Sequence, residues 1–342
     1  MAVALVGPTA SGKSQTALDV VRTVRASRVA VGTIVGAAGD GATVGGDVEL
    51  VSVDSMSVYR GMDIGTAKPR PEVRAEVRYH LVDLVDPDEE FTVTQFQAAA
   101  ADVLAGIAER GNRAVLVGGT GLYLRSVIDD LEFPGRFPGV AAGLTAELDR
   151  SGPVGSAARE AGLAGLHARL GLLDPVAAAR IEPGNERRLV RALEVTIGAG
   201  RPFSGFGPGL ERYPPTRFAL VGIGPDPDAD GRRIADRRIA DRFARMMDEG
   251  LLDEVRRLAA RPGGLSRTAR QALGYRELLT HVEAGVPLDE AVDEAVRRTK
   301  QFARRQWAWF RRDPRIEWVG ADGDPVAAVV SRLDGHADGV YR

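Results

Sequence analysis

The chain has 342 residues, of which 44% are hydrophobic and 27% are charged, and its formal net charge is −2. This size and composition suit one large globular domain or two smaller ones, and the near-neutral balance argues against a surface that is basic throughout. The absence of cysteine excludes disulfides, cysteine-ligated zinc and a cysteine nucleophile. The histidines have no metal-ligand spacing and are expected to be structural or at the surface; they are His80, His167, His281 and His336.

The ends and the hydropathy of the chain bear on its location. The first expected strand begins at residue 2, which leaves no room for a signal peptide. No run of about 18 apolar residues is present, so we expect no transmembrane helix. The sequence therefore predicts a cytoplasmic protein with no membrane partner.

The first motif along the chain is a phosphate-binding loop at 7–14, which fits G-x-x-x-x-G-K-[ST] at every fixed position. An apolar run at 2–6 precedes it as a strand, and a helical stretch follows from Gln15, so a chance glycine loop is the weaker interpretation. Backbone N–H groups would surround phosphate oxygens, Lys13 would add a positive charge, and the Ser14 hydroxyl would bind Mg²⁺. The predicted phosphate-binding residues are Gly7, Pro8, Thr9, Ala10, Ser11, Gly12, Lys13 and Ser14.

The next segment, 26–48, is rich in glycine and has little to bury. We expect an exposed extra loop there and assign it no function.

Alternation of strands and helices then predicts the fold class. Helical stretches such as 93–110 separate further β-type runs, which lie at 50–53, 80–85, 114–117 and 217–223. This order is typical of an α/β fold in which helices flank a parallel sheet. Ligands bind such sheets at the carboxyl ends of the strands. The phosphate loop, Asp54 and Thr120 each follow a strand, so we expect them to converge at one edge.

Asp54 ends the strand at 50–53 and allows three interpretations. Its carboxylate could hold Mg²⁺ in the manner of a Walker-B aspartate, or act as a general base. It could also cap the following turn, because Asp-Ser is good capping chemistry. Position alone leaves these interpretations open.

Two glycine-containing segments are further candidates. The run Gly-Gly-Thr-Gly at 118–121 follows a strand, and its glycines would let the backbone approach a ligand closely. Thr120 can donate and accept a hydrogen bond there, although an ordinary strand-to-helix turn with a threonine cap is the alternative. The loop at 61–69 is either an active-site flap, given its place after Asp54, or a solvent loop.

The segment 137–212 has helical periodicity and no strand signal, which predicts a small all-helical insertion domain. It divides the phosphate-loop core into 1–136 and 213–319, and we expect a peripheral tail at 320–342. Within the second part, the five residues at 232–236 are repeated at 237–241, and a local duplication in one helix is the simplest account.

A basic helix is expected at 297–312, where no acidic residue occurs. A solvated helix face is the common interpretation of such a run. Without local neutralisation, however, the run favours a polyanion partner such as an RNA backbone. The insertion adds further positive charge at 187–191.

Taken together, these motifs resemble the bacterial tRNA dimethylallyltransferases of the tRNA isopentenyltransferase family. The resemblance runs in order from about residue 2 to 318 and rests on the residues at 7–14, 53–69, 117–123, 185–194, 272–277 and 304–307. It implies transfer of a dimethylallyl group from dimethylallyl diphosphate to N6 of adenosine 37, beside the anticodon of tRNA. Diphosphate would be released, and a monomer is expected.

The resemblance also implies roles for individual residues. Asp54 would accept the proton of adenine N6 as a general base, and Thr120 would hydrogen-bond in the reaction centre. Lys13, the loop amides and Mg²⁺ on Ser14 would stabilise charge on the leaving diphosphate. In the family an arginine contacts diphosphate, and its counterpart in this chain lies at 238–242, in the helix that contains the short repeat. We expect Arg238 rather than Arg242 to make this contact.

Three segments match the family's tRNA contacts: Asp54, Ser55, Met56 and Ser57; Arg187, Arg188, Leu189, Val190 and Arg191; and Arg270, Gln271, Gly274, Tyr275 and Arg276. The target adenine lies in the anticodon arm and would be flipped out at a cost of a few kcal/mol. The chain departs from the family at the start of the insertion's first helix, where an arginine is common and this chain has Ala142. Arg136 would have to replace that tRNA contact. The zinc finger of eukaryotic relatives is excluded without cysteine.

Two other classes of function compete with this one. A nucleotide or small-molecule kinase would use the same loop with ATP, and the insertion at 137–212 would imitate its lid. A non-catalytic RNA-binding module is less favoured, because binding alone needs neither Asp54 nor a complete phosphate loop. Among prenyltransferases, an enzyme acting on free adenylates is disfavoured by the insertion and the basic helix.

Overall fold

The structure, a computed structural model, describes residues 2–35, 46–207, 209–225, 228–320 and 322–335. The chain divides into two compact units, each of which is described here by itself. The first comprises Met1–Asp130 and Pro215–Arg342, and the second comprises Leu131–Pro214. The second unit begins earlier and ends later than the insertion expected at 137–212.

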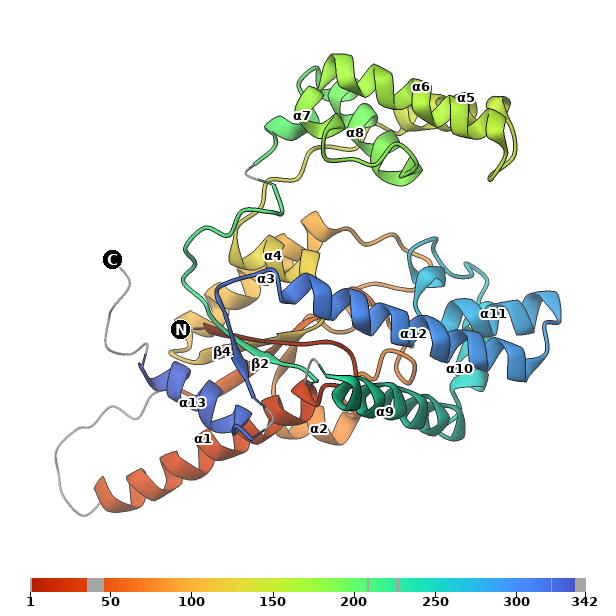
Figure 1. The fold of residues 1–342 in the computed structure, drawn as a ribbon. Coiled ribbons are helices and arrows are strands. Elements are labelled where there is room, and N and C mark those ends of the chain that lie inside the picture. Colours follow the sequence, from red (N-terminus) through yellow and green to blue (C-terminus); the bar gives the residue numbers. More distant parts are fainter. Residues whose placement is uncertain (1, 36–45, 208, 226–227, 321, 336–342) are drawn as a thin grey trace. The chain divides into compact units, whose positions relative to one another are not determined.

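The first unit is built on a parallel sheet (Figure 1). Its strands are β1 (Ala2–Val6), β2 (Val48–Val53), β3 (Tyr79–His80), β4 (Arg113–Gly118), β5 (Ala219–Ile223) and β6 (Ile316–Val319). Their order across the sheet is β3-β2-β4-β1-β5-β6. Val6 and Val53 both pair with Gly118, so β1, β2 and β4 end at one level. The expected α/β fold is confirmed.

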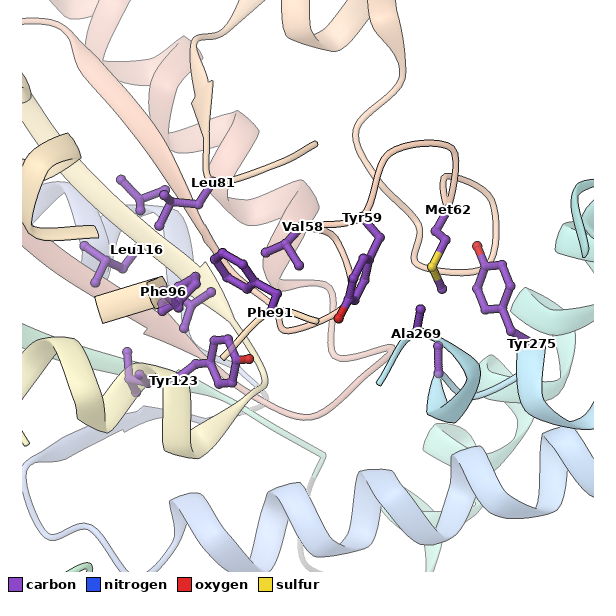
Figure 2. Close-up of a cluster of buried hydrophobic side chains, with 14 of the residues drawn as sticks. Val58, Tyr59, Met62, Leu81, Phe91, Phe96, Leu116, Tyr123, Ala269 and Tyr275 are labelled. Carbon is purple, nitrogen blue, oxygen red and sulfur yellow. The ribbon is translucent and has the colours of Figure 1, made fainter. Parts of the chain in front are cut away.

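Helices cover both faces of this sheet. They are α1 (Lys13–Val35), α2 (Pro71–Glu76), α3 (Val93–Glu109), α4 (Gly121–Ile128), α9 (Ala229–Asp248), α10 (Leu251–Ala259), η2 (Ala269–Gln271), α11 (Tyr275–Ala284), α12 (Leu288–Phe310) and α13 (Pro325–Gly335). Alternate residues of β1 point to opposite faces. Val3 and Leu5 join a core with α1 and α13, whereas Ala4 and Val6 join a larger core with α3, α4 and α9 to α12. Figure 2 shows part of the larger core, including Tyr59 and Tyr275.

Two local expectations are corrected. The strand expected at 80–85 ends at His80, because Leu81 and Asp83 have positive φ angles of 61° and 55°, which extended strands do not allow. Residues 26–35, expected within a glycine-rich loop, continue α1 instead. No glycine or proline occurs between Lys13 and Val31, so helix propensity does not stop the helix there. Residues 36–45 of that expected loop lie outside the described residues.

Every secondary-structure element in the described part of the second unit is a helix. It contains α5 (Pro138–Ser151), α6 (Ala157–Leu173), α7 (Pro175–Ala178), α8 (Glu186–Ala199) and η1 (Phe203–Gly205). Leucines at helical spacing form its own core; they are Leu144, Leu148, Leu163, Leu166, Leu170, Leu189 and Leu193. Ser156 and Asn185 cap α6 and α8 by accepting hydrogen bonds from backbone amides. In the described parts of both units, no helix has the length and apolar character needed to cross a membrane.

Candidate active site

The sheet register brings residues from three predicted site segments to one cavity of about 520 Å³. Because β1, β2 and β4 end at one level, the phosphate loop, Asp54 and Thr120 emerge from the same edge. Thr9, Asp54 and Thr120 all line the cavity. Three segments that are far apart in the sequence therefore form one wall.

Close packing explains two glycines at this edge. A Cβ atom on Gly7 would lie 2.1 Å from the carbonyl oxygen of Ile223 on β5. A Cβ atom on Gly119 would lie 2.4 Å from Nε2 of Gln306. A side chain at position 7 would displace the phosphate loop or β5, and one at position 119 would displace the amide of Gln306.

Lys13 begins α1 and turns back over the phosphate loop. Its Nζ donates a hydrogen bond to the carbonyl oxygen of Pro8 at 3.0 Å. Desolvation, followed by repulsion from Arg242, lowers the pKa of Lys13 to about 8, and attraction to Asp54 opposes that shift. The buried Ser11 Oγ has no hydrogen-bond partner among the described residues. A buried hydroxyl and a desolvated cation in one loop are suited to binding an anion.

Arg242, rather than Arg238, is the guanidinium beside the phosphate loop. Its Nη1 donates to Thr9 Oγ1 at 3.2 Å, and its side chain lines the cavity. Desolvation lowers the pKa of Arg242, and attraction to Asp54 opposes that shift. Arg238 lies one helical turn earlier on α9 and is exposed, away from the cavity lining. The structure thus places Arg242, and not the expected Arg238, beside the phosphate loop, while contact of either arginine with diphosphate stays a prediction.

Asp54 caps the turn after β2 and also lines the cavity. Its Oδ1 accepts a hydrogen bond from the Met56 amide at 2.8 Å. Within the described residues, Oδ2 has no hydrogen-bond partner. The capping interpretation therefore accounts for one oxygen and leaves the other available for chemistry.

Thr120 is the residue before α4, but its side chain does not cap that helix. Instead its Oγ1 accepts a hydrogen bond from the Ser55 amide at 3.4 Å. The alternative of an ordinary capped turn is thus not what the structure shows. The hydroxyl connects the β4 edge to the residue that follows Asp54.

Sequence reasoning missed Gln306 as a member of the site. This buried amide on α12 accepts a hydrogen bond from the Thr9 amide and donates one to the Gly119 carbonyl. It lay within a run interpreted for its arginines, and only its place in the family motif at 304–307 could have singled it out.

The loop at 61–69 is part of the cavity rather than a solvent loop, since Gly65 and Thr66 line it. Its centre is bound by Glu254 of α10, which sequence reasoning also missed. Its end is held by the buried Lys68, which donates to Asp63 Oδ1 at 3.0 Å and to Asp83 Oδ1 at 2.6 Å.

The residues expected to contact tRNA fall into two groups, one exposed or lining the cavity and one buried. Ser55, Met56, Gln271 and Arg276 line the cavity, and Arg187 and Arg188 are exposed on α8 of the second unit. Four other residues of the expected set are buried, so their side chains do not lie at the surface for RNA to contact; they are Ser57, Leu189, Gly274 and Tyr275. Leu189 belongs to the core of the helical unit because it faces inward at helical spacing.

The remaining expected contacts have partners within their own units. Arg270 forms an ion pair with Glu283. Arg191 is half-buried and pairs with Glu194 at 2.8 Å, while Val190 is half-buried beside the helical core. An RNA phosphate would therefore compete with existing contacts at both arginines.

The basic run on α12 is partly neutralised, contrary to expectation. Glu294, one turn earlier, pairs with Arg297 and Arg298, and Asp236 of α9 pairs with Arg304 at 2.8 Å. In the described ranges, four cations of this run have no acidic partner: Lys300, Arg305, Arg311 and Arg312. Arg305 lines the cavity.

Comparisons with known proteins place this arrangement in a family context. The family model described as IPP transferase matches residues 57–313. A tRNA dimethylallyltransferase of Streptomyces coelicolor is 43% identical over 317 residues, covering 93% of this chain and 89% of the relative. Another from Desulforudis audaxviator is 39% identical over 328 residues, covering 95% and 94%.

Solved structures give the same result. The tRNA isopentenylpyrophosphate transferase of Bacillus halodurans has a TM-score of 0.63 and 32% identity, covering 98% of both chains. A eukaryotic dimethylallyltransferase described as acting on tRNA has a TM-score of 0.66 and 20% identity, covering 98% of this chain and 77% of that one. The second likeness concerns the fold alone.

Proposed function

The chain belongs to the IPP transferase family, and we propose that it transfers a dimethylallyl group from dimethylallyl diphosphate to N6 of adenosine 37 in tRNA. The observation that carries this proposal is a cavity lined by Asp54, Arg242 and Thr9 of the phosphate loop. Lys13 of the same loop and Arg242 are both attracted electrostatically to Asp54. Such a cavity has a cationic end for a leaving diphosphate and a carboxylate for a nucleophile. The family and its named relatives favour this reaction over the kinase alternative.

The phosphate loop would stabilise the leaving group. As the carbon–oxygen bond of the allylic diphosphate breaks, negative charge develops on the departing diphosphate. Lys13, Arg242 and the loop amides supply positive charge and N–H donors near that position, and electrostatic stabilisation of this kind is commonly the largest contribution to catalysis. No phosphoryl transfer is needed, so ATP is not a substrate in this proposal.

Asp54 would serve the acceptor. The lone pair of adenine N6 is delocalised into the ring, so N6 becomes a better nucleophile if its proton is accepted as the new carbon–nitrogen bond forms. Asp54 Oδ1 is held by the Met56 amide at 2.8 Å, which fixes the carboxylate while Oδ2 remains free of hydrogen bonds within the described residues. Thr120 supports the same segment through the Ser55 amide.

Mg²⁺ fits the donors at the start of α1. The Ser14 side chain is exposed there and offers a hard oxygen. No cluster of three or more acidic or histidine side chains suited to a metal occurs in the described part of the chain. Mg²⁺ commonly keeps several waters and binds substrate phosphates with few protein ligands, so Ser14, waters and diphosphate oxygens would hold the ion. When bound, the ion would add positive charge at the leaving group.

The polynucleotide partner in this proposal is the anticodon arm of tRNA. Arg276 and Arg305 at the cavity, and Arg187 and Arg188 on the helical unit, would contact its phosphates. Adenosine 37 would leave the stack to reach Asp54, and those contacts would compensate the cost. The phosphate loop and Asp54 belong to one chain, so the cavity needs no second copy to complete it, and we infer a monomer. We place this monomer with its tRNA in the cytoplasm.

The test is transfer of labelled dimethylallyl diphosphate to unmodified tRNA bearing A36-A37-A38, with Asp54→Asn as the variant. Asparagine keeps an oxygen for the Met56 amide but cannot accept the N6 proton, so we expect a loss of about 100-fold or more in kcat. Label in tRNA that persists undiminished in the variant would remove Asp54 from its role. No label from the wild type, with ATP turnover instead, would replace the proposal with the kinase.

A further inference from the structure

Glu254 on α10 is a buried carboxylate, 3% exposed, that binds consecutive backbone amides of the loop at 61–69. Its Oε2 accepts from Asp63 N at 3.1 Å and from Ile64 N at 2.9 Å, and its Oε1 accepts from Gly65 N at 3.3 Å. Successive amides that converge on one anion form a backbone nest, and hydrogen bonds to a charged acceptor are stronger than neutral ones. The centre of this loop is therefore held by one side chain from a distant element.

The same carboxylate is bound by Tyr275 at the start of α11. The Tyr275 hydroxyl donates to Glu254 Oε1, and the ring is fully buried. Burial, then the neighbouring Glu254 carboxylate, raise the pKa of Tyr275, so its hydroxyl stays protonated as a donor. Gly65 packs on this ring, since a Cβ atom on Gly65 would lie 2.4 Å from Tyr275 Cε2. Figure 2 shows Tyr275 beside Met62 of the loop.

Glu254 thus joins two segments that line the cavity, although Glu254 itself does not line it. The loop contributes Gly65 and Thr66, and the segment before Tyr275 contributes Gln271 and Ala272. Neither segment belongs to the phosphate loop. A substitution of Glu254 would therefore displace these two segments, but not the diphosphate-binding residues.

We propose that Glu254 is a positioning residue that holds the loop at 61–69 and the start of α11 in the geometry that the transfer reaction requires. The inference rests on the proposed function for the reaction it names. Glutamine in place of Glu254 keeps one acceptor oxygen but sets an NH2 group against groups that are themselves donors, so the loop and the start of α11 shift. A displacement of about 1 Å is enough to impair a reaction that depends on near-attack geometry.

The experiment compares Glu254→Gln with Asp253→Asn. Asp253 is the exposed neighbour on α10, it pairs with Arg256 at 3.0 Å, and its substitution removes the same charge. Each purified chain is assayed for steady-state transfer to tRNA, for calorimetric binding of inorganic diphosphate, and for hydrogen exchange of the amides at 63–65. For Glu254→Gln we expect kcat/KM for tRNA to fall about tenfold or more and exchange at 63–65 to accelerate. The affinity of Glu254→Gln for diphosphate should equal that of the wild type. The control Asp253→Asn should equal the wild type in all three assays.

A second variant, Tyr275→Phe, keeps the amide nest and removes one donor only. We expect it to fold and to lose less transfer activity than Glu254→Gln, and it carries the test if Glu254→Gln does not fold. Wild-type transfer kinetics in both variants would overturn this inference alone. Parallel losses of transfer and diphosphate binding would also overturn it, since they indicate general destabilisation. Absence of transfer by the wild-type chain would overturn the proposed function instead.

Discussion

Gln306 on α12 holds the phosphate loop through Thr9, whose amide donates to Gln306 Oε1 at 2.8 Å across 297 residues of sequence. The other end of the same side chain donates from Nε2 to the Gly119 carbonyl at 2.8 Å. The helix that carries the basic run therefore also fixes the two turns that flank the cavity. A displacement of α12 would be transmitted directly to the phosphate loop.

Substitution of Gln306 by glutamate should weaken diphosphate binding. Glutamate keeps the acceptor for Thr9 but places a negative oxygen against the Gly119 carbonyl, where no donor remains. We expect the Kd of inorganic diphosphate, measured by calorimetry, to rise about tenfold, equivalent to about 1.4 kcal/mol. Ala308→Glu adds the same charge at an exposed position of α12 and is the control. Equal affinities in both variants would contradict the bridging role.

Alanine variants of Arg242 and Arg238, which lie one helical turn apart on α9, serve as test and control. Arg242→Ala removes the guanidinium beside Thr9, whereas Arg238→Ala removes an exposed one. Loss of a hydrogen bond to a charged group costs about 1.5–3 kcal/mol, so KM for dimethylallyl diphosphate should rise about tenfold to 100-fold in the first variant. The second should remain within about twofold of the wild type. A reversed order of effects would restore Arg238 to the site.

The lowered pKa of Lys13 predicts a pH dependence of diphosphate binding. Its pKa of about 8 means that the ammonium is lost as pH rises through 8, and the neutral amine no longer attracts the ligand. The ratio of affinities between the wild type and Lys13→Met should therefore fall by up to about tenfold per pH unit above 8. Use of the ratio cancels titration of diphosphate itself. A ratio that stays constant from pH 7 to 10 would exclude this role.

Thr120 is predicted to act on catalysis more than on affinity. Thr120→Val keeps the shape of the side chain but removes the oxygen that accepts from Ser55. We expect kcat to fall about threefold to tenfold, from the loss of about 0.5–1.5 kcal/mol, with little change in diphosphate Kd. Thr120→Ser should recover most of the rate in single-turnover assays. Similar rates in the valine and serine variants would show that the hydroxyl is dispensable.

Local sequence determined the class of fold and the edge at which the site lies. The strand at 2–6, the loop at 7–14 and the helix after it are contiguous, so their relation needs no distant contact. Parallel strands share one carboxyl edge, which is why positions directly after strands predicted that Asp54 and Thr120 lie with the phosphate loop. The all-helical character of 137–212 followed from periodicity in the same way.

Folding in three dimensions settled which side chains complete that edge. Arg242 and Arg238 differ by one helical turn in a helix rich in arginine, and the packing of α9 against the phosphate loop distinguishes them. Gln306 and Glu254 act across 297 and about 190 residues, respectively, and neither hydropathy nor spacing records such contacts. Leu189 and Tyr275 lie within segments matched to RNA contacts, yet their burial depends on the elements that pack over them. Periodicity reports which face of an element is apolar, while the partner of each polar side chain is decided by the chain that folds against it.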